Sequence, residues 1–153
     1  PPPPAEADSG LDAPAATRDD ALAGGDDDFD ALEEDPPANA GYADLARQAR
    51  DFAVKVLKLE NAPELEPVFY LSAGKIGANL AGGHGLGYDE EAICGNIVKC
   101  RWALADCEFC REMLEHLAAR TDKPPYAQLL AESRALSATI RLRIDHLRAR
   151  VWW

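Results

Sequence analysis

Residues 90–120, "EEAICGNIVKCRWALADCEFCREMLEHLAAR", carry the pattern that decides the fold. Apolar residues recur every three or four positions along the whole stretch, and this spacing predicts one long α-helix. The first apolar stripe of this helix is expected to face a core and contains Ile93, Ile97, Cys100, Leu104, Cys107, Leu114 and Ala118. A helix of this length must bury such a stripe against neighbouring helices.

A second apolar stripe lies nearly opposite the first and contains Val98, Trp102, Ala105, Phe109 and Met113. A helix that is apolar on two sides has to bury both, but a monomeric four-helix bundle covers only one. The second stripe therefore predicts a subunit interface, since large exposed apolar stripes are uncommon without a partner. The alternative is that the N-terminal segment or the Trp152–Trp153 end covers it.

Three further segments show helical spacing. They cover residues 42–61, residues 68–82 and residues 126–153, and prolines separate the first two and precede the last. The apolar positions of the last segment are Leu129, Ser133, Leu136, Ile140, Ile144, Leu147 and Val151. No strand pattern competes, so we predict an all-α fold in which residues 41–153 form an antiparallel up-down four-helix bundle.

Residues 1–40 differ from the rest in composition. They hold twelve acidic residues against one base, Arg18, whereas residues 41–153 hold fifteen of each sign, so the net charge of −11 belongs to this segment. It is rich in Pro, Ala and Asp and has one aromatic residue, which predicts a disordered acidic tail. Its acidic–aromatic core is either a solvated run or a docking segment for a basic partner, and it contains Asp26, Asp27, Asp28, Phe29 and Asp30.

The glycines of "ANLAGGHGLGYDEEA", residues 78–92, raise the question of a phosphate-binding loop. Such a loop follows a strand, and its common form supplies a lysine to the phosphate. Here a predicted helix precedes the glycines, the glycine run has no lysine or arginine, and Asp89, Glu90 and Glu91 occupy the first turn of the next helix. These carboxylates would repel phosphate, so we interpret the run as a sharp corner between two helices.

The four cysteines all lie on the third predicted helix, where Cys107 and Cys110 have a spacing found in metal sites. Structural zinc needs four ligands, and neither a second cysteine pair nor a histidine pair accompanies them. Packing in the core is the favoured interpretation, and a metal or redox site at Cys100, Cys107 and Cys110 is the alternative. We expect no cofactor and no catalytic residues, because the sequence shows no pairing of a nucleophile with a base.

The runs "IGANLAGGHGLGYDEEA", residues 76–92, and "KCRWALADCEFCREMLEHL", residues 99–117, resemble a family of small bacterial four-helix bundles. These proteins are encoded in intervening sequences of 23S ribosomal RNA, and the same superfamily includes the accessory variability proteins of diversity-generating retroelements. The resemblance covers about residues 42–150, includes "LLAESRALSATI" in the last helix, and is most specific at the family loop, with Asn79, Gly83 and Gly85.

The resemblance implies a non-enzymatic protein that assembles into a ring-like pentamer. A cytoplasmic setting is the default expectation, because the sequence shows neither a secretory signal nor a membrane-spanning run. In the retroelement branch the ring binds RNA and a reverse transcriptase through basic surface. The candidate RNA-binding residues here are Lys75, Arg134, Arg141, Arg143, Arg148 and Arg150. Arg134, Arg141 and Arg148 recur every seven residues, so five subunits would present them as a polyvalent phosphate-binding surface. The alternative is a solvated helix face.

Three functions thus remain open from the sequence. The first is an RNA-binding accessory protein, for which neutralising Arg141 and Arg148 should abolish salt-sensitive binding. The second is a protein-only adaptor whose acidic tail docks on a basic partner, and the third is a metal or redox protein. No apolar run approaches the roughly 18 residues that a membrane-spanning helix needs, so no membrane partner is expected.

Overall fold

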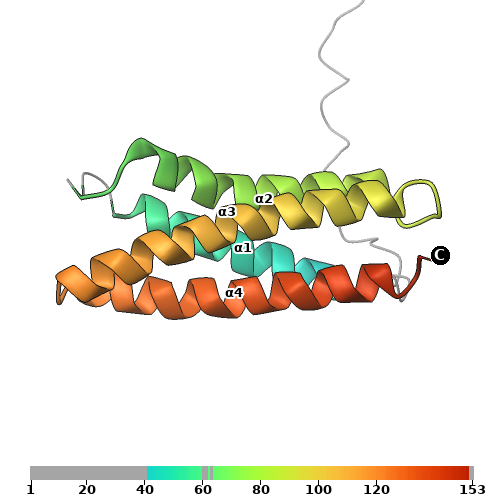
Figure 1. Cartoon of the computed structure of the whole chain (residues 1–153). Coiled ribbons are helices and arrows are strands. Elements are labelled where there is room, and N and C mark those ends of the chain that lie inside the picture. The colour runs from blue at the N-terminus through green and yellow to red at the C-terminus, as the bar shows by residue number, and fades with distance from the viewer. Residues whose placement is uncertain (1–40, 60–61, 63, 152–153) are drawn as a thin grey trace, which may run out of the picture. The chain divides into compact units, whose positions relative to one another are not determined.

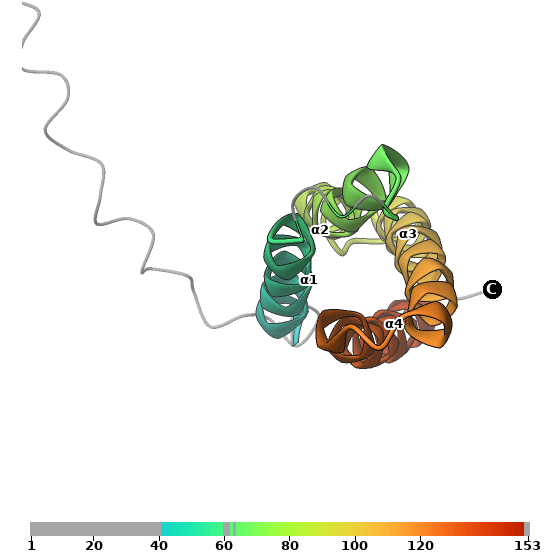
Figure 2. The same cartoon turned by 90° about the vertical axis from the view of Figure 1, so that its left-hand side faces the viewer.

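The computed structural model describes residues 41–59, 62 and 64–151, and these residues form four α-helices without a strand. The helices are α1 (Tyr42–Leu57), α2 (Pro67–Leu86), α3 (Ile93–Arg120) and α4 (Pro124–Arg148). The helix axes are roughly parallel, and successive helices run in opposite directions (Figure 1). Together the four helices surround a central core (Figure 2). The predicted all-α up-down bundle is confirmed, while the predicted tail, residues 1–40, lies outside the described residues.

Each helix contributes one apolar row to the core. The fully buried large side chains come from all four helices and include Phe52, Phe69, Ile76, Leu114, Ile140 and Leu147. Burial of these side chains from water supplies the main stabilisation of the bundle. The α2–α3 and α3–α4 contacts are the most extensive, so α3 is the central element of the packing.

The starts of α2 and α4 follow directly from proline chemistry. Pro67 and Pro124 occupy the first position of their helices, where the missing N–H of proline costs no intrahelical hydrogen bond. The predicted ends were less accurate. Helix α1 stops at Leu57, before the predicted 61, and α4 stops at Arg148, so Val151 lies beyond the helix and is half-buried.

The glycine run is not itself the corner between α2 and α3. Helix α2 continues through Gly82, Gly83 and Gly85 and ends at Leu86. The chain turns at Gly87, whose φ of 104° is a conformation that favours glycine. The corner that the sequence predicted is therefore present, but it begins several residues later than expected.

The acidic residues after Gly87 precede α3 instead of forming its first turn, as the sequence had suggested. Helix α3 begins at Ile93, and the Asp89 carboxylate accepts a hydrogen bond from the backbone N–H of Ala92 at 2.8 Å. A short acidic side chain in this position satisfies a backbone donor that the helix leaves unpaired. Asp89 thus helps to fix the entry into α3.

Gly83 allows α2 and α3 to approach closely near the corner. A Cβ atom at this position would lie 2.8 Å from Oδ1 of Asn96 and 3.1 Å from Cβ of Lys99. Asn96 is buried, and its amide donates a hydrogen bond to the carbonyl of Gly87 at 3.1 Å. The absence of a side chain at Gly83 therefore makes room for the residue that holds the corner.

Candidate functional site

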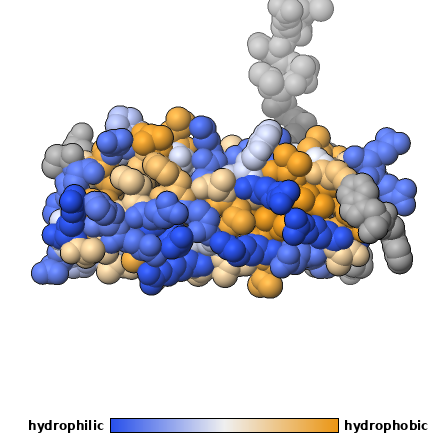
Figure 3. Space-filling view, viewed as in Figure 1, coloured by the Kyte–Doolittle hydropathy of each residue, from blue (hydrophilic) through white to orange (hydrophobic). Residues whose placement is uncertain are grey.

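The outer side of α2 and α3 carries exposed apolar residues, which we call the α2–α3 face. The face is defined by Val68, Leu71, Gly74 and Ala78 of α2 and by Val98, Trp102, Ala105, Phe109 and Met113 of α3. Apolar side chains lie along α2 and over the N-terminal half of α3 in Figure 3. The two helices are packed neighbours.

The predicted second stripe of α3 is only partly open to water. Trp102 is 53% exposed and Val98 is 44% exposed, and Ala105 is also exposed. Phe109 and Met113 are half-buried and pack against the core. The ammonium group of Lys99 lies 4.7 Å from the centroid of the Trp102 ring, a favourable cation–π contact.

The contribution of α2 to this face was missed from the sequence. Leu71 is 57% exposed and Val68 is 44% exposed, and the exposed positions Gly74 and Ala78 lie between them and the corner. Lys75 is the sole Lys, Arg, Asp or Glu between Pro67 and Leu86. That lack of charge was the available signal, because a solvent-facing helix normally carries charged residues on its outer side.

The arginine stripe of α4 is largely engaged in ion pairs with α3. Arg134 lies 3.1 Å from a carboxylate oxygen of Glu115, and Arg141 lies 2.8 Å from one of Glu108. The Glu108 carboxylate also accepts a hydrogen bond from the hydroxyl of Ser137. These contacts join α3 to α4, so Arg134 and Arg141 already have anionic partners within the chain.

The electrostatics of this seam centre on Glu108. Hydrogen bonds from Ser137 and Arg141 lower the pKa of the Glu108 carboxyl to about 2, with a further contribution from Arg111 on the same helix. Arg111 also bridges to Glu115 at 2.7 Å. The seam is therefore a connected network of alternating charges, in which each carboxylate serves more than one donor.

Arg143 lies inside the bundle, which does not suit the predicted role in contacting an external phosphate. It is only 6% exposed, and its guanidinium donates a hydrogen bond to the hydroxyl of Tyr88 at 2.7 Å. Its position on the helical wheel placed it away from the stripe of Arg134, Arg141 and Arg148, but burial could not be read from the sequence alone. Arginine is mostly exposed in proteins and is fully buried only when paired.

Tyr88 connects the corner to three helices. Its hydroxyl is 2.6 Å from Nδ1 of His84, whose ring stacks on Tyr42 with centroids 3.8 Å apart. Burial raises the pKa of the Tyr88 phenol, although Arg143 opposes this effect. The phenol therefore remains neutral and can donate to His84 while it accepts from Arg143. These contacts tie the corner to α1, α2 and α4.

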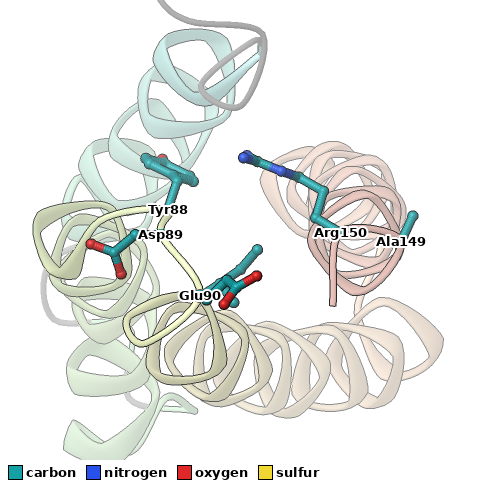
Figure 4. Close-up of a pocket in the computed structure, with 6 residues that line it drawn as sticks. Tyr88, Asp89, Glu90, Ala149 and Arg150 are labelled. Atoms are coloured by element: carbon teal, nitrogen blue, oxygen red, sulfur yellow. The ribbon is translucent and has the colours of Figure 1, made fainter. Parts of the chain in front are cut away.

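A cavity of about 530 Å³ opens beside Tyr88 at the end of the bundle. In Figure 4 the Arg150 side chain extends from the end of the last helix toward Tyr88. Glu90 and Ala149 also line the cavity. The lining carries both signs of charge, with Asp89 and Glu90 on one side and Arg150 on the other. This mixed lining selects no single class of small ligand.

The other candidate cations are exposed. Lys75, Arg148 and Arg150 lie at the surface, and none of them has a carboxylate within 4.0 Å in the described part of the chain. Lys75 is on α2, far along the chain from the two arginines at the end of α4. The predicted RNA-binding set thus divides into three groups. Arg134 and Arg141 are exposed but paired with carboxylates, Arg143 is buried, and Lys75, Arg148 and Arg150 are exposed without a carboxylate partner among the described residues.

The residues of the predicted family loop serve the contact between α2 and α3. The Asn79 amide donates a hydrogen bond to the carboxylate of Asp106 at 3.2 Å. Gly83 faces Asn96 across the helix contact, whereas Gly85 is exposed, and a Cβ atom there would meet no neighbouring atom within 4 Å. Two of the three residues therefore have a packing role in this chain.

The cysteines behave as core residues, as the favoured interpretation predicted. Cys100, Cys107 and Cys110 are buried, and Cys94 is half-buried. Burial raises the pKa of the Cys107 and Cys110 thiols to about 12, so both stay protonated at neutral pH. Among the described residues, no three Cys, His, Asp or Glu side chains are grouped so that they could hold a metal ion.

The predicted docking residues, Asp26, Asp27, Asp28, Phe29 and Asp30, lie outside the described residues. Within the described part of the chain, no helix combines the length and the apolar character needed to cross a bilayer. Comparison of the chain with protein-family models, with curated proteins and with solved structures gave no match in any of the three. The family resemblance therefore stays a prediction.

Proposed function

We propose that this chain is a non-enzymatic helical bundle that associates with further copies of itself through the α2–α3 face. We further propose that the assembly acts as an accessory binding protein. The observation that carries the proposal is the exposure of Leu71, Val68, Val98 and Trp102 on two adjacent helices. Removing such a surface from water is favourable at about 25 cal/mol per Å².

The small residues of α2 support a contact between helices of different copies. Gly74 and Ala78 are exposed one turn apart, and neither position carries a side chain larger than a methyl group. Helices approach most closely where small residues line the contact, and the larger Leu71 and Trp102 can then pack beside them. The single charge on this side of α2, Lys75, leaves little repulsion between copies.

Light scattering coupled to size exclusion tests the proposal directly. The wild-type chain should have a mass several times 16.6 kDa, and a fivefold value is what the family resemblance implies. Leu71→Asp and Trp102→Asp should each lower the mass, because a carboxylate would be buried in the interface at a high desolvation cost. Circular dichroism should show that both variants keep their helices.

Leu142→Asp is the matched control. Leu142 is 70% exposed on α4 and does not belong to the α2–α3 face, so this variant should keep the wild-type mass. A monomeric wild-type chain would refute the proposal. So would an assembly that survives Leu71→Asp, or one that Leu142→Asp disrupts equally.

Binding of structured RNA by the assembly is a second candidate function. It is favoured by Arg148 and Arg150, which are exposed near the end of α4 without a carboxylate partner among the described residues. Several copies would multiply the few cations that each chain offers. Retention of a structured RNA by the protein, and its release as salt rises, would be the expected signature.

Paired variants distinguish this candidate from general charge effects. Arg148→Gln combined with Arg150→Gln should weaken RNA binding, because both guanidinium groups are available to phosphate. Arg134→Gln combined with Arg141→Gln removes the same charge but should have a smaller effect, since Glu115 and Glu108 already hold these groups. RNA binding that is equal in wild type and in the Arg148/Arg150 variant would reject this candidate.

A further inference from the structure

We infer that a groove between α3 and α4 binds an acidic peptide segment in which an apolar side chain stands among carboxylates. This α3–α4 groove has a volume of about 460 Å³ and is lined by Cys94, Ile97, Val98, Arg101, Arg148 and Val151. It lies beside the first turns of α3 and the end of α4. It shares only Val98 with the α2–α3 face, and the inference does not rest on self-association.

Three of the residues that line the groove are aliphatic, Ile97, Val98 and Val151, and we call them its floor. Ile97 is buried, Val98 is 44% exposed, and Val151 is half-buried beyond the end of α4. The volume lies in the range of sites that take up a side chain or a small ligand. An apolar side chain placed here would leave water and contact the three aliphatic residues, which is the favourable part of binding.

Two of the residues that line the groove are positively charged, Arg101 and Arg148, and we call them its walls. Arg101 on α3 and Arg148 on α4 are exposed, and neither has a carboxylate within 4.0 Å among the residues that the structure describes. Of the described residues that line the groove, none is acidic. The two guanidinium groups are thus available to carboxylates of a ligand, unlike those of Arg134 and Arg141 in the neighbouring seam.

This combination favours a peptide over a nucleic acid. Single-stranded RNA is held by aromatic platforms on which its bases stack, whereas the floor here is made of isoleucine and valine. A phosphate backbone would use the two arginines and leave the apolar floor in water. A peptide with carboxylates on both sides of an apolar residue matches the floor and the walls together.

The chain itself contains a sequence of this chemistry, "DDDFDALEED", residues 26–35. A fluorescently labelled synthetic peptide of these ten residues is therefore the probe. Fluorescence anisotropy with the full-length protein should show saturable binding. A peptide with serine in place of Phe29 and Leu32 keeps every charge, and we expect it to bind roughly tenfold more weakly because it cannot fill the apolar floor.

Two protein variants test the groove by making the same charge change at different places, Arg148 beside the groove and Arg120 far from it. Arg148→Glu should weaken binding of the probe by roughly tenfold or more, because a repulsive charge replaces an attractive one. Arg120→Glu makes the same change in net charge at the far end of α3 and should leave binding unchanged. A full-length variant with asparagine at residues 26–28 and 30 removes competition from the chain's own acidic residues.

Several outcomes would overturn the inference. These are equal binding of the serine peptide, an equal loss with Arg120→Glu, and displacement of the probe by a structured RNA that itself loses affinity with Arg148→Glu. Absence of binding to both the wild-type chain and the asparagine variant would also overturn it. Tighter binding to the asparagine variant would support the groove and identify the chain's own segment as a competitor.

Because Leu71→Asp changes only the α2–α3 face, failure of the two proposals can be told apart. A chain that is monomeric but still binds the probe would retain the groove and lose the proposed self-association. A multimeric chain that does not bind the probe would retain the proposed self-association and rule out the groove.

Discussion

The two sides of α3 are held to their neighbours by different chemistry. Toward α4 the contact is a charged network, with Glu108 and Glu115 bound to Arg141 and Arg134. Toward α2 the contact depends on close approach, because Gly83 faces the buried side chain of Asn96. In the charged seam between α3 and α4, the carboxylates and guanidinium groups pair with one another within the chain. In the close-packed seam between α2 and α3, by contrast, the outer side of the two helices carries exposed apolar side chains.

This difference changes which surface is available to partners. A stripe of arginines in a sequence suggests a binding surface, but two of the three arginines here have carboxylate partners on the neighbouring helix. The nearly uncharged α2 suggests a buried helix, yet Leu71 and Val68 are exposed. Whether a surface is available to a partner thus depends on the charged and apolar groups of the adjacent helix. The pattern of a single helix predicts it less well.

Gly83→Ala should give the largest loss and tests the close-packed seam. The new Cβ would lie 2.8 Å from Oδ1 of Asn96, so the helices or the corner must shift. We expect a loss of about 1–3 kcal/mol in the free energy of unfolding, measured in urea, despite the higher helix propensity of alanine.

Gly85→Ala is its matched control, because this glycine lies two residues away in the same helix and has open space around it. It should gain up to about 1 kcal/mol, as expected for glycine to alanine in an exposed helix. If Gly83→Ala stabilised the protein as much as Gly85→Ala, the contrast between the two seams would be wrong.

Glu108→Gln tests the charged seam and should have an intermediate effect. The folded-state pKa of Glu108 is about 2, below its value in the unfolded chain, so the ionised form stabilises the fold above the unfolded pKa. We expect Glu108→Gln to cost about 1–2 kcal/mol at neutral pH, after allowance for solvent screening.

The loss of stability in Glu108→Gln should depend on pH. As pH falls from about 5 toward 2, the wild-type carboxylate becomes protonated and its advantage is lost, so wild type and Glu108→Gln should converge. Urea unfolding at a series of pH values measures this. A difference that stays constant down to pH 2 would show that the charge of Glu108 does not act as inferred.

Arg134→Gln should have the smallest effect. Its guanidinium and the Glu115 carboxylate are both substantially exposed, and exposed ion pairs contribute little because water and salt screen them. The shift in Tm should be below about 2 °C and should disappear at high salt. A larger shift that persists in 1 M salt would mean that the charged seam acts as one cooperative unit.

Much of the fold could be predicted from the sequence because helices repeat their apolar pattern locally. Most of the buried residues of α4, such as Leu129, Leu136 and Ile140, were predicted from three- and four-residue spacing, whereas Tyr126 and Arg143 were not. The starts of α2 and α4 were also predicted closely, because Pro67 and Pro124 favour the first position of a helix through their own backbone chemistry. The glycines misled the prediction of the end of α2, because a helix tolerates glycine when neighbouring packing compensates.

The candidate site could be predicted less well, since its chemistry depends on residues far apart in the chain. Arg143 and Asn96 are polar, and only the meeting of α4 and α3 with the corner provides the partners that let them be buried. Likewise, the pairing of Arg141 with Glu108 joins residues thirty-three positions apart. No local pattern contains such contacts.

The sequence by itself determined the number of helices, the core-facing rows of α1, α3 and α4, and the concentration of acidic charge in residues 1–40. These properties follow from local spacing and composition. The tertiary structure decided which arginines are paired, buried or available, and which apolar residues stay in contact with water. The physical reason is that both charge pairing and burial depend on the neighbouring helix, whose position is fixed only when the bundle is assembled.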